Sequence, residues 1–129
     1  MASRKSSNDS ALVYVTAPSA READRIALTT VNEGLAACAN VLGPIRSIFR
    51  WQGKVERSRE VSLILKTRRT RLAALTRRVK ALHSYSVPCI VALPIVGGNP
   101  DFLSWIAAEC APGGRRARAR ARVKPRGNR

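Results

Sequence analysis

Two strongly apolar strand patterns on either side of one amphipathic helix pattern constrain the fold of this chain most. The strand patterns are V-S-L-I-L-K at Val61–Lys66 and C-I-V-A-L-P-I-V at Cys89–Val96. A further strand pattern, A-L-V-Y-V at Ala11–Val15, precedes a second amphipathic helix pattern. With a strand hairpin between the two helices, this order predicts an α+β fold with the split β-α-β-β-α-β arrangement.

Cap and turn signals locate the other elements. Ser19 begins the first helix pattern and Glu22 follows at a capping-box spacing, with apolar residues continuing on one helical face to Leu35. A hairpin tip is predicted at 52–54. The remaining expected elements are strands at 39–42, 45–51 and 55–67, a second helix capped by Thr67 or Thr70 and ending near Leu82, and an extra short helix from Pro100 that ends by Cys110.

The strand patterns are apolar on both sides of the sheet. Leu63, Ile64 and Leu65 are consecutive, and so are the apolar residues 90–93. Because successive side chains of a strand point to opposite faces, both faces are apolar there. The chain's own helices cover one face, and the other would form an apolar patch larger than monomers usually expose. We therefore expect self-association.

Positive charge is concentrated at the end of the chain. The 129 residues, 45% of them hydrophobic, fit a single domain and include 24 Lys and Arg against 8 Asp and Glu, a net charge of +16. Residues 115–129 carry eight of the basic residues and no acidic residue. We expect a disordered N-terminus at 1–10, a folded domain at 11–111, and a disordered basic tail at 112–129.

The three cysteines do not form a disulfide framework. Their number is odd and none has C-x-x-C spacing, which favours a reducing compartment and a cytoplasmic location. The polar N-terminus lacks an apolar signal core, and no apolar run is long enough to span a membrane. The chain also lacks the G-x-S-x-G, P-loop and H-E-x-x-H motifs, so we expect no enzymatic activity.

Seven motifs resemble those of the CutA family of divalent-cation tolerance proteins, in the same order and at the same spacing. The resemblance runs from about Val13 to Ile106. The motifs are T-A-P at 16–18, G-L-A-A-C-A-N-V at 34–41, W-Q-G-K at 51–54, L-I-L-K-T at 63–67, H-S-Y-S-V-P-C-I at 83–90, L-P-I at 93–95 and D-F-L-S-W-I at 101–106. The resemblance implies a ferredoxin-like subunit in a homotrimer, a role in tolerance of metal ions, particularly copper, and binding of divalent metal ions.

The resemblance and the side-chain chemistry together give three candidate metal ligands. Positions of the family's proposed copper ligands match Val15, Leu82 and His83, and only His83 keeps a metal-binding side chain. Cys89 lies six residues beyond His83 and replaces a family Glu, and Cys38 is a weaker candidate. The alternatives are a histidine that interacts with a helix C-terminus and, for Cys38 and Cys110, small buried apolar side chains.

Five further residues are candidates for a cleft between subunits. In the family, matching positions line such a cleft, which combines aromatic, basic, acidic and phenolic side chains. The candidates are Trp51, Glu60, Lys66, Tyr85 and Trp105. Packing at a subunit interface is the alternative interpretation, and it is the favoured one for Trp51 and Trp105.

Two other functions compete with metal binding. A trimer of this shape also serves small-molecule signalling proteins of the PII type, an analogy of fold. The net charge suggests nucleic-acid binding, but the two central strands contain no aromatic residue on which bases could stack. We therefore expect no specific nucleic-acid recognition, and at most non-specific binding of anionic polymers by the basic tail.

Overall fold

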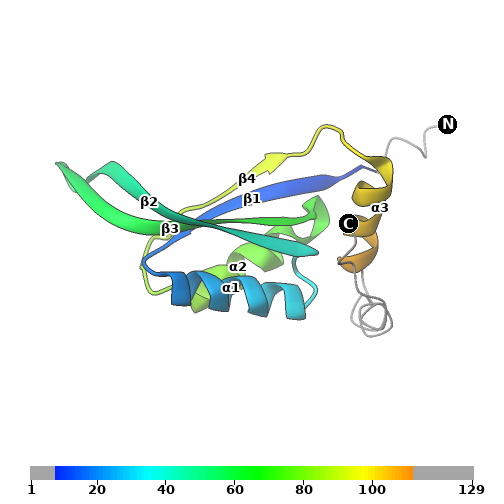
Figure 1. The fold of residues 1–129 in the computed structure, drawn as a ribbon, viewed down its shortest axis with the longest axis horizontal. Helices are drawn as coiled ribbons and strands as arrows, with labels where there is room; N and C mark the ends of the chain where they lie inside the picture. The colour runs from blue at the N-terminus through cyan, green and yellow to red at the C-terminus, as the bar shows by residue number, and fades with distance from the viewer. Residues whose placement is uncertain (1–7, 112–129) are drawn as a thin grey trace.

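The computed structural model describes residues 8–111 and contains one four-stranded antiparallel sheet with three α-helices (Figure 1). The sheet has the order β2-β3-β1-β4, so the central strands are β3 and β1. The expectation that the 89–96 strand is central is wrong, because β4 lies at an edge, and the central strand β1 carries an aromatic residue, Tyr14. The element order confirms the predicted α+β fold with an extra C-terminal helix. The elements are β1 (Ser10–Ala17), α1 (Ala20–Asn32), β2 (Cys38–Trp51), β3 (Lys54–Arg68), a 3-10 turn (Arg69–Arg71), α2 (Leu72–Leu82), β4 (Ile90–Pro94) and α3 (Pro100–Glu109).

The core lies between the sheet and the α1/α2 layer. Strands β1 and β3 contribute alternate residues that are fully buried, including Val13, Leu63 and Leu65, and the helices contribute Ile26 and Leu75. Figure 1 shows both helices below the sheet, α3 near one end, and no helix or strand of residues 8–111 over the upper face. The fold therefore buries only one face of its sheet.

The uncovered face of the sheet is also apolar. Leu12 pairs with Leu93, and Tyr14 pairs with Val91 on one side and Ile64 on the other. Val91 and Leu93 are 51% and 52% exposed. The prediction that the strands are apolar on both sides is confirmed.

The long β2–β3 hairpin differs from the expected pattern in one respect. β2 is a single strand that passes Gly43 and Pro44 through a bulge between Val41 and Gly43. Gly43 has a φ of +113°, which glycine adopts without a steric penalty, so the strand continues where an interruption was expected. Gln52 and Gly53, both with positive φ, form the predicted hairpin tip.

The helix ends also depart from the prediction. Ser19 caps α1 as expected by accepting a hydrogen bond from Glu22 N at 3.1 Å. The helix ends at Asn32 rather than continuing to Leu35, because Gly34 adopts a left-handed φ of 74°. Thr67 caps no helix. Its hydroxyl donates to Leu35 O at 2.7 Å and ties β3 to the segment after α1.

Residues 8–10 make defined contacts with the folded domain, contrary to the prediction. Asp9 forms an ion pair with Arg68 at 3.2 Å, Asn8 Nδ2 donates to Ile95 O, and Ser10 is a buried residue of β1. The prediction of a disordered segment at 1–10 is therefore wrong from residue 8 onward. Its remainder and the predicted basic tail at 112–129 lie outside the described residues. Within 8–111, no helix has the length and apolarity needed to cross a membrane.

Replacing Leu65 by Ala tests the one-sided core. Leu65 is completely buried, so we expect Leu65→Ala to lower the free energy of unfolding by about 2–5 kcal/mol. Leu28, on α1, is 66% exposed, and Leu28→Ala is the matched control, with an expected change within about 0.5 kcal/mol. Denaturant unfolding at fixed protein concentration measures both. Equal decreases in the free energy of unfolding of the two variants would contradict a core in which Leu65 is buried and Leu28 is exposed.

Candidate functional site

A cleft of about 750 Å³ lies on the uncovered side of the sheet, between the β2–β3 hairpin and the loop that joins α2 to β4. Its walls come from four segments of the chain: β1, β2, β3 and the loop. The lining includes Tyr14, Ile45, Phe49, Trp51, Glu60, Tyr85 and Cys89.

The cross-strand register of the hairpin explains which side chains line the cleft. Ile45 pairs with Glu60, Ser47 with Ser58 and Phe49 with Glu56. Because alternate residues share a face, these pairs follow one another on the cleft side. Ile45 and Phe49 were not identified from the sequence. Period-two counting from the hairpin tip would have placed them with Glu60, because the bulge in β2 lies beyond Ile45.

Tyr85 and Glu60 form the principal polar contact of the cleft. The Tyr85 hydroxyl donates to Glu60 Oε2 at 3.0 Å, and Glu60 is buried, with 8% of its surface exposed. Burial, followed by this hydrogen bond and the charge of Glu60, raises the pKa of Tyr85 above its ordinary value of 10.0. The phenol therefore stays protonated at neutral pH and supplies the hydrogen bond that the buried carboxylate needs.

Cys89 provides a sulfur atom at the edge of the same cleft. Burial is the main cause that raises the pKa of its thiol above 9.0, the hydrogen bond with Thr16 opposes that shift, and the charge of Glu60 adds to it. Cys89 is accordingly a thiol, not a thiolate, at neutral pH. A metal ion that binds here must displace the proton.

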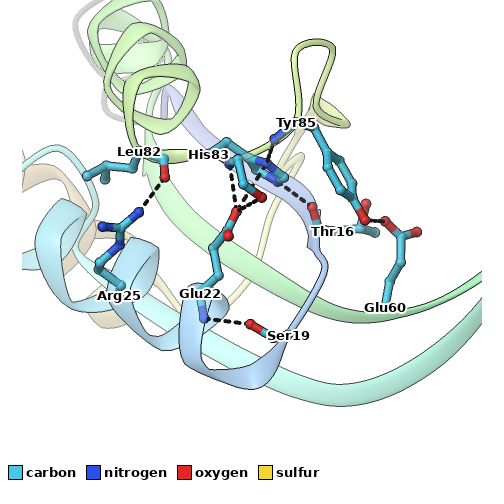
Figure 2. A network of polar contacts seen from close by, with 9 residues as sticks. Thr16, Ser19, Glu22, Arg25, Glu60, Leu82, His83 and Tyr85 are labelled. Carbon is cyan, nitrogen blue, oxygen red and sulfur yellow. Dashed lines mark hydrogen bonds and ion pairs between the residues drawn. The ribbon is translucent and has the colours of Figure 1, made fainter.

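The protein engages both ring nitrogens of His83. Figure 2 shows the ring between Thr16 and Glu22. Nε2 lies 2.7 Å from Thr16 O, and Nδ1 accepts the Tyr85 backbone N–H at 3.1 Å, which assigns the Nε2–H tautomer. The Glu22 carboxylate lies 3.3 Å from Nδ1 and accepts two hydrogen bonds from Ser84, one from its backbone N–H and one from its hydroxyl. His83 thus fixes the position of the loop that carries Tyr85.

Lys66 and Trp105 do not belong to the cleft. Lys66 Nζ donates a hydrogen bond to Asn40 Oδ1 at 2.6 Å and lies 5.8 Å from the ring centroid of Phe102. The ring centroids of Phe102 and Trp105 are 5.3 Å apart. Lys66 shares a face with Glu60, but six residues of extended strand separate them by about 20 Å. The structure therefore brings Trp51, Glu60 and Tyr85 together and places Lys66 and Trp105 in a separate group beside α3.

The three candidate metal ligands do not form a cluster within one chain. Cys89 borders the cleft, the ring nitrogens of His83 are engaged, and Cys38 pairs with Lys66 at the far end of β2. Over residues 8–111, no group of three or more His, Cys, Asp or Glu side chains is arranged to hold a metal ion. A complete coordination sphere would need donors from outside this part of the chain.

Known proteins resemble the chain over nearly all of the described fold. The family model described as CutA1 divalent ion tolerance protein matches residues 11–109. The divalent-cation tolerance protein CutA of Archaeoglobus fulgidus is 49% identical over 94 residues, which are 73% of this chain and 91% of that protein. The chloroplastic protein CutA 1 of Oryza sativa is 45% identical over 82% of this chain, a match that spans only 60% of the rice protein.

A solved structure gives the same result for the fold. The periplasmic divalent cation tolerance protein CutA of Archaeoglobus fulgidus superposes with a TM-score of 0.76 at 45% identity, covering 79% of this chain and 99% of that one. Because similar chains are described as periplasmic and chloroplastic, the prediction of a cytoplasmic location is wrong. Cysteines that are free in the described fold, as all three are here, do not identify a compartment.

The contact between Tyr85 and Glu60 predicts a specific pH dependence. The folded state holds the Tyr85 proton more tightly than the unfolded chain does. The resulting stability is present below about pH 10 and is lost as the pH rises through the raised pKa. Glu60→Gln should lower this pKa but leave it above 10.0, because burial is the largest cause. Titration by NMR of the tyrosine ring carbons measures the change, and a pKa of Tyr85 that does not respond to Glu60→Gln contradicts the contact.

Proposed function

Because the chain belongs to the CutA1 divalent ion tolerance family, we propose that it is a homotrimeric divalent-cation tolerance protein that binds a metal ion, with copper as a candidate, at the cleft. The observation that carries the proposal is the presence of Cys89 and Glu60 in one cleft that opens on an uncovered apolar face. The proposal includes no catalytic step.

The uncovered sheet face supports the assembly. Leu12, Tyr14, Ile64, Val91 and Leu93 occupy neighbouring positions on this face, and no helix of the described chain covers them. Covering them with other copies removes apolar surface from water, which contributes about 25 cal/mol of favourable free energy for each Å² buried, before the entropic cost of association is subtracted. Because the cleft opens on this same face, a second copy is positioned to complete it.

The donor types in the cleft support the choice of metal ion. Cys89 supplies sulfur and Glu60 supplies carboxylate oxygen, and the charge of Glu60 acts on the Cys89 thiol. Sulfur ligands favour copper and zinc over magnesium and calcium. The bound ion supplies positive charge that favours the thiolate of Cys89. His83 and Cys38 lie outside this donor set, since the His83 ring holds the loop and Cys38 lies at the other end of β2.

A small organic ligand is the second candidate for the cleft. Its volume of about 750 Å³ falls within the usual range for small-molecule sites. Tyr14, Phe49 and Trp51 form apolar walls, and the Tyr85–Glu60 pair supplies polar groups. Thermal stabilisation by organic anions or nucleotides, without stabilisation by metal ions, would favour this function.

An acidic residue on the uncovered face tests the homotrimer. We expect Leu93→Asp to shift the protein from trimer to monomer, because it places a charge in the apolar contact. Leu28→Asp, on α1 and away from this face, is the matched control and should leave the trimer intact. Native mass spectrometry reads the subunit number directly. A parent protein that is monomeric at micromolar concentration contradicts the assembly.

Removing the Cys89 sulfur tests the metal site. We expect Cys89→Ser to weaken binding of zinc and copper(II) by about tenfold or more, while Cys38→Ser binds as the parent does. Metal uptake by the parent should also strengthen with rising pH, because the thiol must lose its proton. Native mass spectrometry and calorimetry with zinc, which is redox-inert, measure both effects. Equal zinc affinity in the parent and Cys89→Ser would show that the Cys89 sulfur is not a metal ligand.

A further inference from the structure

The face of the β2–β3 hairpin that points away from the cleft carries four arginines. In the register of the hairpin, Arg46 pairs directly with Arg59, Arg57 with Ile48, and Arg50 with Val55. All four arginines are exposed. Alternation along the strands places these pairs together, opposite the face that holds Glu56 and Glu60. We call Arg46, Arg50, Arg57 and Arg59 the arginine face.

The described chain leaves the charge of this face uncompensated. Its acidic neighbours on β3, Glu56 and Glu60, belong to the cleft side. Within residues 8–111, the three ion pairs involve other residues, and none of the four arginines donates a side-chain hydrogen bond. Like charges directly opposite each other on neighbouring strands destabilise a hairpin, so the Arg46–Arg59 pair opposes folding.

We propose that the arginine face binds the phosphate backbone of double-stranded nucleic acid without sequence preference. Guanidinium groups match phosphate oxygens in a bidentate geometry, and all four cations of this face are arginines rather than lysines. Arg57 and Arg59, two residues apart on one strand, are separated by about 7 Å along it. A two-stranded ribbon also has a width that the major groove admits. The face has no Asn, Gln, Asp or Glu side chain that could read the edge of an adenine or a cytosine.

Two other partners fit the face less well. Ile48 and Val55, 70% and 61% exposed, lie between the arginines and suggest an anionic membrane. However, this face has no Trp or Tyr, the residues typical of membrane interfaces, and Trp51 lies on the cleft side. A second copy of this chain would need an acidic face of similar extent, and the chain has only 8 acidic residues against 24 basic ones.

The experiment must separate the arginine face from the eight basic residues at 115–129. The full-length triple variant Arg46→Gln, Arg50→Gln, Arg59→Gln removes three charges of the face and leaves Arg57, which also borders the cleft. The matched control Arg21→Gln, Arg77→Gln, Lys80→Gln removes three exposed charges from α1 and α2. Both variants retain residues 115–129 and have the same net charge.

Binding to a labelled random-sequence DNA duplex is measured by fluorescence anisotropy at several salt concentrations. For the parent, the logarithm of the association constant should fall linearly with the logarithm of salt concentration. In the arginine-face variant we expect this slope to decrease in magnitude by about 0.9 for each lost phosphate contact, with an affinity loss of at least about tenfold at low salt. The control should keep the parent slope, and each protein should bind a duplex of scrambled sequence as tightly as it binds the original duplex.

The controls make the result decisive. Thermal unfolding shows that the variant is folded, and its midpoint should equal or exceed that of the parent, because the Arg46–Arg59 repulsion is gone. Equal slopes in the two variants would overturn the proposal and assign the binding to general charge or to residues 115–129. Loss of binding to anionic phosphatidylserine vesicles with unchanged DNA binding would overturn it in favour of a membrane. A change of subunit number with unchanged DNA binding would overturn it in favour of a contact between copies.

Discussion

One layer of two helices covers only one face of this sheet, and the rest of the structure depends on that constraint. Leu63 and Leu65 complete the core under the helices, while Ile64 between them faces the other way. The same alternation continues into the hairpin, where one side forms the cleft and the other carries arginines. Every surface with a candidate function is therefore a part of the sheet that the helices leave uncovered.

Polar contacts hold the loop that forms one wall of the cleft. The loop that carries Tyr85 is fastened by the buried ring of His83, by Glu22 through Ser84, and by the Tyr85 hydroxyl on Glu60 (Figure 2). Buried polar groups must be satisfied, so the loss of one partner leaves others unpaired and disturbs the whole loop. An effect of a His83 substitution on ligand binding is thus expected even though the ring lies outside the proposed donor set, and such an effect alone does not identify a metal ligand.

The sequence was most informative where one physical signal dominated. The apolar runs predicted β3, β4 and the two-faced sheet, and the T-A-P to D-F-L-S-W-I motifs indicated the family. Prediction was poorest where neighbours in space decide the role of a residue. His83 has the chemistry of a ligand, yet its ring nitrogens are bonded to the protein. Lys66 has the parity of a cleft residue but lies too far along the strand. Asn8 and Asp9 look like a polar terminus, but Ile95 and Arg68 bind them.

The hairpin separates two chemistries by strand alternation alone. On β3, Glu56, Ser58 and Glu60 face the cleft, while Arg59 faces away from it and Arg57, on the same side of the strand as Arg59, reaches the cleft's border. Five consecutive residues thus present carboxylates on one side and guanidinium groups on the other. A one-residue slip of β2 against β3 would exchange the faces of the β2 side chains and place Arg46 and Arg50 in the cleft. The bulge between Val41 and Gly43 sets this register, since it changes which residues of β2 face Glu60 and Arg59. A glycine that looks like an interruption of the strand in the sequence therefore determines which side chains of β2 lie beside Glu60 in the cleft and which lie beside Arg59 on the arginine face.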